Sequence, residues 1–437
     1  MNWYKKCKNK IVTTETSSRI IKNSGWLVSD KVLTMAIGVF ITAIVARYFG
    51  PEQYGQFNYA LAFVSLFTAI STLGLESLTV KSIVDKKVNE GVILCTSLLL
   101  RVVGGIVLTI MAVIIINFIE PGNSDLQILV LIMSFTMIAK SFEVIEYWIQ
   151  ASQKSKISSL IRMSVYVVMS VLKVLLVVKG GNLVHFALIY TLDAVIVSMA
   201  LIIAYFKFRE ERSAWKYSFS YTKDILSQSW YLILSGLMIT IYMRIDQVML
   251  GSMMSSKLEV GIYSAAVRIA EMWYFIPIAI ITSFRPVIMK NRNINDEKYL
   301  KSLQLLYTII AWTGIGFGIV TLILSKALVS ILYGIDFLEA ASILSISVWA
   351  GTFALLGSVR SIWLISEGLQ KYTLIFMGGG AIVNIILNYL FIPYMGGKGA
   401  AVATLIAQAM VAFFIPLLFK DTRIASFMIL KAFKFKI

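Results

Sequence analysis

The sequence is poor in the residues that build metal sites and disulfide frameworks. Among 437 residues there are two cysteines and one histidine, and Cys7 and Cys95 are far apart with no CxxC spacing. A zinc site or a disulfide scaffold needs closely spaced Cys or His ligands, so both are excluded. No GxxxxGKS or GxxxxGKT motif occurs, so ATP is not the expected energy source, and no cofactor is expected. The single histidine, His185, is expected near a loop without a special role.

Charged residues are also scarce. They make up 14% of the chain, and 58% of residues are hydrophobic, whereas a soluble domain has about 25% charged residues. Apolar runs of about 20 residues recur along the whole length, which is the length of a helix that crosses a bilayer. Segments of about ten residues that alternate between apolar and polar, which are typical of a membrane β-barrel, are absent. The sequence therefore predicts an all-α polytopic membrane protein.

Twelve membrane spans are predicted, joined by short polar connectors. The first 24 residues are polar and basic and lack the apolar core of a cleavable signal peptide, so the first span is expected to be an uncleaved anchor. The connectors leave no room for an extramembrane domain. The predicted spans are 25–48, 56–79, 92–117, 126–147, 157–178, 183–206, 225–250, 261–285, 303–324, 338–365, 372–393 and 398–419.

The distribution of Lys and Arg predicts the orientation. Connectors on the side of the N-terminus contain 26 of these residues. The opposite side contains 5, when Arg47 and Lys398 at the ends of spans are counted with it, and the other 9 lie within spans. Because cytoplasmic loops are enriched in Lys and Arg, both termini are expected in the cytoplasm. The formal charge of +17 is therefore attributed to topology and to an anionic ligand rather than to nucleic acid.

A weak internal repeat suggests two similar halves. EQYGQFNYA at 52–60 resembles EVGIYSAA at 259–266, with an offset of 206 from Gly55 to Gly261, and the pair Gln-Lys at 153–154 recurs at 370–371. Two matches at similar offsets predict two six-helix lobes related by a parallel pseudo-two-fold repeat, with a substrate path where the lobes meet. The expected domains are an N-terminal lobe at 1–206, a basic cytoplasmic linker at 207–224 and a C-terminal lobe at 225–437.

The cations inside the predicted spans are the first functional candidates, because each costs roughly 2.5–3.5 kcal/mol near the bilayer centre. Those near span ends could either snorkel to the headgroups or face a cavity: Arg101, Arg162, Arg285 and Arg360. Those that lie deeper or next to an acid are candidates for an internal aqueous cavity: Lys31, Arg244 and Arg268. The remaining two, Lys140 and Lys173, lie on spans four and five. A surplus of cations suits a phosphate or pyrophosphate, which Arg binds through its planar fork.

Three acids lie beside these cations. Lys140 and Glu143 are three residues apart, as are Arg268 and Glu271, a spacing that brings side chains together on a helix. Asp246 lies two residues from Arg244 and therefore points to another helix. Coupling to protons or sodium through Asp246 or Glu271 is an open alternative. Pro277 is expected to kink the eighth span, because it removes a backbone hydrogen bond.

Three stretches of the sequence together carry a family resemblance. The first stretch is ARYFGPEQYGQFNYALAFVSLFTAISTLGLE at 46–76. The second comprises RIDQVMLG at 244–251, EVGIYSAAVRIAEMWYFIP at 259–277 and TSFRP at 282–286. The third is SEGLQKYTLIFMGGGAIVNIILNYLFIPYMGGKGAAVAT at 366–404. These stretches resemble the polysaccharide repeat-unit flippases, the O-antigen (Wzx-type) branch of the multidrug/oligosaccharidyl-lipid/polysaccharide exporter superfamily. The similarity extends over nearly the whole chain, and the three stretches are more specific together than singly. The location that this resemblance implies is a bacterial inner membrane.

This resemblance implies a transporter rather than an enzyme. It would carry an undecaprenyl-pyrophosphate-linked oligosaccharide from the cytoplasmic to the outer leaflet by alternating access through a cationic central cavity. By motif position, the implied translocation residues are Arg244, Asp246, Arg268 and Glu271, and Lys31 is added from its depth. Further candidates for the cavity are Arg101, Lys140, Glu143, Lys173 and Arg360. Implied partners are membrane lipids and, in the same pathway, a polymerase and a chain-length regulator.

Rival functions remain open at this point. A multidrug or cation antiporter of the same superfamily needs acids to dominate the cavity, and here cations outnumber them. A peptidoglycan-precursor flippase typically has two additional spans, for which this chain has no room. A membrane-embedded polysaccharide polymerase or glycosyltransferase is expected to have a sizeable outer loop with catalytic carboxylates or arginines. The outer loops of this sequence are short turns.

Overall fold

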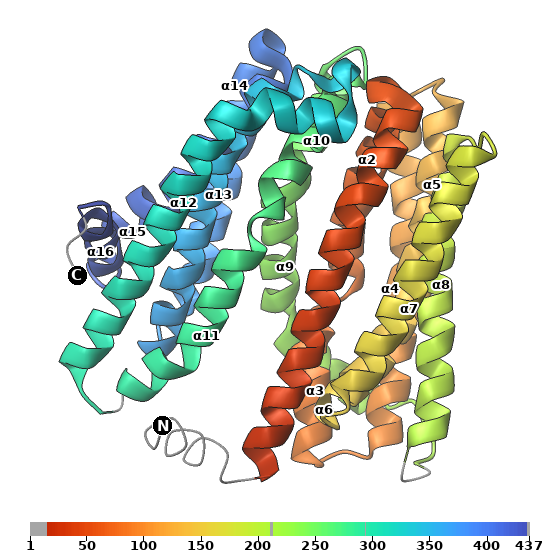
Figure 1. Cartoon of the computed structure of the whole chain (residues 1–437). Coiled ribbons are helices and arrows are strands. Elements are labelled where there is room, and N and C mark those ends of the chain that lie inside the picture. Colours follow the sequence, from red (N-terminus) through yellow and green to blue (C-terminus); the bar gives the residue numbers. More distant parts are fainter. Residues whose placement is uncertain (1–14, 210–212, 293, 435–437) are drawn as a thin grey trace, which may run out of the picture. The chain divides into compact units, whose positions relative to one another are not determined.

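The structure is a computed structural model that describes residues 15–209, 213–292 and 294–434, and in these residues it is helical, without strands. Figure 1 shows the helices in chain order. They are α2 (Glu15–Ser71), α3 (Leu75–Asp85), α4 (Glu90–Ile119), α5 (Ser124–Ala139), the 3-10 turn η1 (Lys140–Glu143), α6 (Val144–Ala151), α7 (Ser155–Val178), α8 (Leu183–Phe208), α9 (Phe219–Met253), α10 (Leu258–Met272), α11 (Phe275–Arg292), α12 (Asp296–Tyr333), the 3-10 turn η2 (Ile335–Phe337), α13 (Ala340–Ser366), α14 (Lys371–Ala409), the π-helical turn η3 (Met410–Phe414), α15 (Ile415–Leu417) and α16 (Arg423–Phe433).

The number of membrane-crossing helices agrees with the prediction of about twelve. Within the described residues, nine helices are long and apolar enough to cross a membrane, and the bent pair α10–α11 adds a tenth. Two of the nine are interrupted by a glycine with non-helical backbone, Gly50 (φ 69°) in α2 and Gly396 (φ 54°) in α14. Positive φ favours glycine at both breaks. Counting each interrupted helix as two spans gives twelve, so the predicted all-α polytopic membrane fold is confirmed.

The bend expected at Pro277 is present. Helices α10 and α11 meet at an angle of 43°, and the break at Trp273 and Tyr274 lies one helical turn before the proline. A proline at position i cannot donate to the carbonyl at i−4, which here belongs to Trp273, so the helix is weakened at that turn. The eighth span is therefore two helical segments rather than one straight rod.

Contacts divide the chain into two compact units. Unit 1 comprises Phe67–Leu234 together with the chain up to Ile41, and unit 2 comprises Thr42–Leu66 together with the chain from Ser235 onward. This division assigns the second part of the long helix α2 to unit 2, and it places the first turns of α9 in unit 1. The lobe boundaries expected at 206 and 225 stay a prediction.

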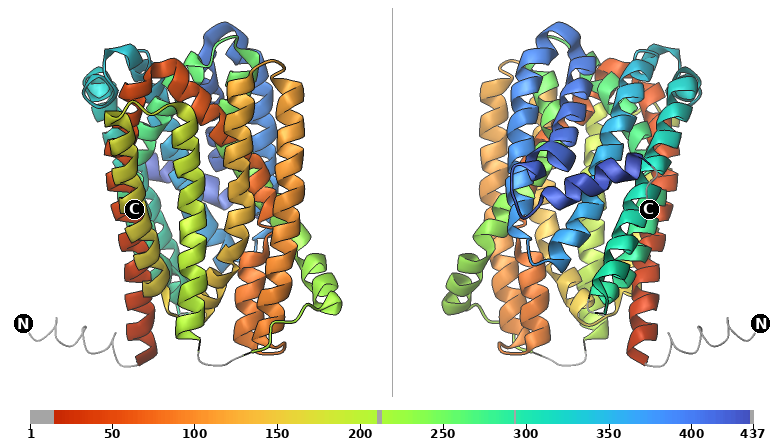
Figure 2. Two further views of the ribbon diagram at one scale, coloured as in Figure 1. Left: turned by 90° about the vertical axis from the view of Figure 1, so that its right-hand side faces the viewer. Right: turned by 90° about the vertical axis from the view of Figure 1, so that its left-hand side faces the viewer.

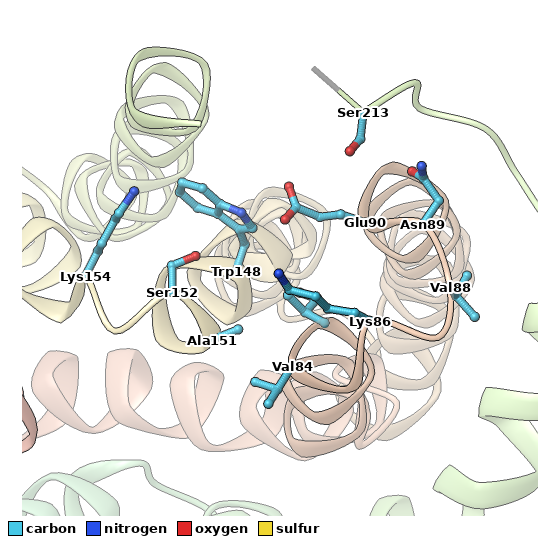
Figure 3. Close-up of a pocket in the computed structure, with 11 residues that line it drawn as sticks. Val84, Lys86, Val88, Asn89, Glu90, Trp148, Ala151, Ser152, Lys154 and Ser213 are labelled. Atoms are coloured by element: carbon cyan, nitrogen blue, oxygen red, sulfur yellow. The ribbon is translucent and has the colours of Figure 1, made fainter. Parts of the chain in front are cut away.

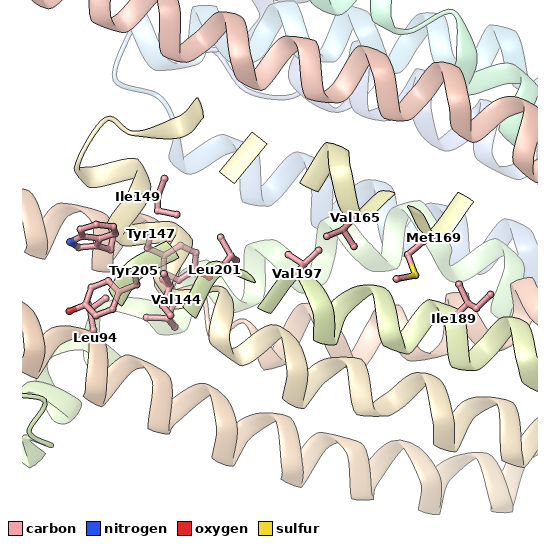
Figure 4. Packing of buried hydrophobic residues seen from close by; sticks show 12 residues of the cluster. Leu94, Val144, Tyr147, Ile149, Val165, Met169, Ile189, Val197, Leu201 and Tyr205 are labelled. Carbon is pink, nitrogen blue, oxygen red and sulfur yellow. The ribbon is translucent and has the colours of Figure 1, made fainter. Parts of the chain in front are cut away.

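Unit 1 packs α4, α5, α7 and α8 side by side, with α8 contacting both α5 and α7. A buried cluster extends along α8, and Figure 4 shows Leu94, Val144 and Tyr205 toward one end of it and Met169 and Ile189 toward the other. The Trp148 ring meets the Tyr205 ring edge-on, with centroids 5.0 Å apart. Large aromatic pairs of this geometry stabilise a core beyond the area that they bury.

Hydroxyl groups connect the helices of unit 1 along their length. Thr109 donates to the carbonyl of Ser134 (3.0 Å), Thr191 to that of Ile132 (2.8 Å) and Ser198 to that of Ala139 (2.7 Å). All three acceptors belong to α5, and the donors lie on α4 and α8. In a membrane, where apolar burial gives little drive for helix association, such interhelical bonds contribute to packing.

Unit 2 packs α12 against α13 and α13 against α14, and these helices lie next to one another in both views of Figure 2. The segment after the last span, expected as a tail, forms the helix α16. This helix lies along α12, where Gln304 donates to the carbonyl of Met428 (3.1 Å) and Trp312 donates to that of Ala432 (3.2 Å). Its backbone is therefore fixed to the bundle by side chains of a spanning helix.

The two glycines of the predicted repeat contact each other within unit 2. A Cβ atom added to Gly261 would clash with the carbonyl oxygen of Pro51, and one added to Gly55 would clash with that of Lys257. The adjacent Glu52 accepts the backbone N–H of Lys257 at 3.0 Å. This carboxylate satisfies a donor at the N-terminus of α10, where negative charge is also favoured by the helix dipole. The repeat motif thus forms a close backbone contact that only glycine permits.

Candidate translocation site

Asp246 lies at the centre of a buried polar cluster in unit 2. The side chain is on α9 and only 3% of the residue is exposed. The Tyr263 hydroxyl (2.7 Å) and the Thr404 hydroxyl (2.6 Å) donate to one carboxylate oxygen, and the Asn388 amide donates to the other (2.6 Å). Three helical segments therefore converge on one carboxylate. No ion pair of Asp246 with a cation is found in the part of the chain that the structure describes.

Helix α14 supplies most of the partners of Asp246. Asn384 and Asn388 lie one turn apart, and the Asn388 amide also contacts Oδ1 of Asn384 (3.2 Å). Thr404 lies beyond the break at Gly396, so the two parts of α14 present their side chains to the same carboxylate. The Asn388 Oδ1 atom is buried, and among the described residues it has no hydrogen-bond partner.

This arrangement is suited to a proton or a small monovalent cation. It contains one negative charge with neutral oxygen ligands around it, which is the donor chemistry that hard cations prefer. Within the described ranges, no group of three or more His, Cys, Asp or Glu side chains is placed to hold a metal ion. The single negative charge of the cluster therefore matches a proton or a monovalent cation better than a divalent metal ion.

Arg244 and Arg268 are half-buried cations of unit 2. Arg244 lies nine residues before the end of α9, and Arg268 lies ten residues after the start of α10. At a rise of 1.5 Å per residue both are about 14–15 Å from the turn that joins these helices. In the described residues, neither guanidinium makes a side-chain hydrogen bond or an ion pair, although Arg268 is within electrostatic range of Tyr54 and Tyr333.

Glu271 is not paired with Arg268, although the spacing suggested that it would be. No ion pair joins them in the described part of the chain, and Glu271 instead lies within electrostatic range of Tyr263 and Tyr274. Glu271 is in the last turn of α10, where the chain bends toward α11.

Arg360 is a buried side chain and does not snorkel. It is 1% exposed, its guanidinium lies 4.5 Å from the centre of the Phe376 ring, and it donates to the carbonyls of Val411 and Ala412. These carbonyls belong to the π-helical turn Met410–Phe414. A π turn disturbs the regular i to i−4 bonding, so its carbonyls are available to a cation from a neighbouring helix.

Arg101 is also buried, in unit 1. Only 2% of the residue is exposed, and it donates to the Tyr147 hydroxyl at 3.0 Å. The snorkelling alternative is therefore wrong for both Arg101 and Arg360, because each has a fixed partner inside its own unit. Arg285, in contrast, is exposed, and the Lys31 side chain lies outside the described residues.

The remaining predicted charges form one network in unit 1. Arg162 on α7 bonds Glu143 (3.1 Å) and also Glu146, a residue that the sequence reasoning did not single out. Lys140 lies 6.0 Å from the centre of the Tyr190 ring. Lys140 is also within electrostatic range of Glu143, and Lys173 is within range of Asp193 on α8. Helix α7 contains no acid, and Arg162 finds its partners on the neighbouring span.

A separate cavity of about 600 Å³ lies at one end of unit 1, between the turn after α3 and the turn after α6. Figure 3 shows Trp148, Glu90 and Lys86 around it. Lys154 lies 5.5 Å from the centre of the Trp148 ring. None of the residues expected to bind substrate lines this cavity.

The fold is that of a multi-pass membrane protein with buried charges, and comparison with known proteins specifies the family. The family model described as polysaccharide biosynthesis protein matches residues 20–292, and the MatE model matches residues 232–390. The first match covers more than half of the chain. The chain therefore belongs to the polysaccharide biosynthesis protein family.

Individual relatives agree with this assignment. The capsular polysaccharide biosynthesis protein CapF of Staphylococcus aureus is 22% identical over 89% of this chain and 96% of its own length. The probable low-salt glycan biosynthesis flippase Agl15 of Haloferax volcanii is 23% identical over 83% of this chain and 76% of its own length. The inward closed structure of the lipid II flippase MurJ has a TM-score of 0.74 at 17% identity, over 93% of this chain and 91% of that one. Flippases among these relatives agree with the expectation of a transporter rather than an enzyme, and the likeness to MurJ shows that the chain shares its fold.

Proposed function

We propose that the protein flips an undecaprenyl-pyrophosphate-linked oligosaccharide, the repeat unit of an O-antigen or another surface polysaccharide, by alternating access. The glycan would move from the cytoplasmic to the outer leaflet of a bacterial inner membrane, with both termini of the protein in the cytoplasm. The observation that supports this substrate is the pair Arg244 and Arg268. Both lie at a similar depth in unit 2, half-buried and without a carboxylate partner in the described residues.

The chemistry of a pyrophosphate matches these two arginines. A guanidinium offers a planar fork of N–H donors that bonds phosphate oxygens in pairs, and it stays charged inside a membrane protein. A doubly charged group that crosses the full field outward gains about 4–5 kcal/mol per 100 mV of inside-negative potential. Fixed cations lower the barrier to this movement, since they replace the water around the phosphates without moving themselves.

Asp246 is proposed as the coupling residue. A proton or a monovalent cation that binds this buried carboxylate neutralises it and would compete for the oxygens that Tyr263, Asn388 and Thr404 bond in this structure. A ligand shifts a conformational equilibrium only by its different affinity for the two states. The polymerase and chain-length regulator expected as partners stay predictions.

Reconstitution tests the substrate assignment. Purified protein in liposomes would be given undecaprenyl-pyrophosphate-linked repeat units, and a membrane-impermeant glycosidase would report how many units reach each leaflet. The wild type is expected to flip the units, Arg244→Ala and Arg268→Ala to lose most of this activity, and the exposed Arg285→Ala to retain it. Full flipping by both of the first two variants would contradict the proposed role of these arginines.

A further inference from the structure

The fourth predicted span of unit 1 is interrupted inside the membrane. Helix α5 ends at Ala139, a 3-10 turn occupies Lys140–Glu143, and α6 resumes at Val144. The turn and the first residues of α6 contain three charged residues within seven positions, Lys140, Glu143 and Glu146. Irregular backbone at membrane depth is tolerated only where it is buried in protein or lines a water-filled space, and a mid-helix 3-10 stretch often marks a functional position.

Arg162 connects this interruption to the next span. Its Nε donates to Glu146 Oε1 at 3.2 Å, and one terminal nitrogen donates to Glu143 Oε1 at 3.1 Å and also to the second oxygen of Glu146. The three side chains are 33%, 21% and 14% exposed for Arg162, Glu143 and Glu146. Charged groups are not exposed to lipid tails, so this surface is in contact with water or with a polar ligand.

The network is electrically balanced, unlike the arginines of unit 2. Its members are three cations and three carboxylates, Lys140, Arg162, Lys173, Glu143, Glu146 and Asp193. A neutral site does not attract a second pyrophosphate. It offers fixed N–H donors and carboxylate acceptors side by side, with the Tyr190 ring next to Lys140. A polyhydroxyl ligand needs this combination, since each sugar hydroxyl both donates and accepts.

Structural stability alone does not account for such a network. Replacing a buried ion-pair network by apolar side chains of similar size is often neutral or stabilising, and the charges add to the free energy of insertion. We propose that the cluster of Glu143, Glu146 and Arg162, with Lys140 and Tyr190 at its edge, binds the saccharide part of the substrate through its hydroxyl groups. This inference rests on the proposed function and assigns to unit 1 the selection of the glycan.

The test compares two probes in the liposome assay. One is undecaprenyl pyrophosphate with a complete oligosaccharide unit, and the other is the same lipid with a single sugar. Glu146→Gln keeps the size of the side chain and removes its charge. The wild type is expected to flip the complete unit at least tenfold faster, and Glu146→Gln is expected to lose this preference by slowing only the complete unit. Arg162→Lys, which keeps the charge and loses the fork, should have the same effect.

The controls separate the possible failures. Glu297→Gln removes a carboxylate that pairs with Lys301 at an exposed site, and it should keep the wild-type preference. If Glu146→Gln and Arg162→Lys remain folded and slow both probes equally, or keep the preference, the saccharide assignment is overturned while the proposed function stands. If the wild type flips neither probe, the proposed function fails and the inference fails with it.

Discussion

Replacing Asp246 separates its structural role from its proposed role in coupling. The carboxylate accepts bonds from Tyr263, Asn388 and Thr404, but two of these donors have a second acceptor. Thr404 also donates to the carbonyl of Ala400 (2.9 Å), and Asn388 also donates to Asn384 (3.2 Å). Asp246→Ala therefore leaves chiefly the Tyr263 hydroxyl unsatisfied, which costs about 1–3 kcal/mol of stability. Asp246→Asn keeps an acceptor oxygen, so its cost is about 1 kcal/mol or less.

The flipping rates of the two variants should not follow the order of their stabilities. If the charge at position 246 binds a proton or a cation, both variants lose coupled flipping, although Asp246→Asn remains nearly as stable as the wild type. Thermal denaturation in detergent and flipping in liposomes would be measured for both variants, with the exposed Asp336→Asn as a matched control. Wild-type flipping by Asp246→Asn would refute the coupling role.

The same variants identify the coupling ion. A ligand at one hundred times its dissociation constant stabilises the folded protein by about 2.7 kcal/mol. If the site binds sodium, exchanging choline chloride for sodium chloride at constant ionic strength raises the denaturation midpoint of the wild type and not that of Asp246→Asn. If the site binds a proton, sodium has no such effect and the flipping rate depends on pH only when Asp246 is present.

Three further predictions concern packing and charge. Gly261→Ala should destabilise the protein by about 1–3 kcal/mol, because its Cβ clashes with the Pro51 carbonyl. As a control, Gly236→Ala should be neutral or stabilising, because a Cβ atom at this position has nothing within 4 Å. Equal denaturation midpoints of the two variants would contradict this prediction. Arg268→Lys should keep part of the flipping that Arg268→Ala loses, since Lys retains the charge without the fork, and full export by both variants would remove Arg268 from the site. Arg360→Met should lower the denaturation midpoint, because it removes the donor to two buried carbonyls of the π turn. An unchanged midpoint would show that these bonds do not contribute to stability.

The fold was predictable because membrane spans are encoded locally. A run of about 20 apolar residues specifies a spanning helix whatever the rest of the chain does, and Pro277 marked the bend in the eighth span. The interruptions at Gly50 and Gly396 also lie between predicted spans. Hydropathy therefore predicted a boundary between two spans at both glycines, although α2 and α14 each continue beyond the break.

Side-chain partners were less predictable, because they come from other helices. Arg360 and Arg101 looked like snorkelling residues from their positions near span ends, but a π turn and a tyrosine hydroxyl hold them inside. Spacing along one helix suggested Lys140 as the partner of Glu143, whereas Arg162 of the next span bonds it instead. Only the tertiary packing determines which neighbouring helix supplies a partner.

Some residues of the candidate site had a signal in the sequence. Asn384 and Asn388 are four residues apart in an otherwise apolar helix, so they share one face, and Thr404 follows in the same stretch of residues 366–404. Amide side chains at membrane depth need a polar partner. Asp246 was an available acid, because the sequence showed no partner for it on its own helix. Glu146 had a similar signal, since it lies three residues after Glu143.

The leaflet in which lipid-linked oligosaccharide accumulates tests the central claim most directly. In cells that lack this protein, complete lipid-linked repeat units would be extracted after treatment of spheroplasts with a membrane-impermeant glycosidase. If the protein flips these units, they accumulate facing the cytoplasm and are protected from the enzyme, and the intact gene restores their export. Accumulation of complete units that are already exposed on the outer leaflet would contradict a flippase and indicate a later step in the assembly of the polysaccharide.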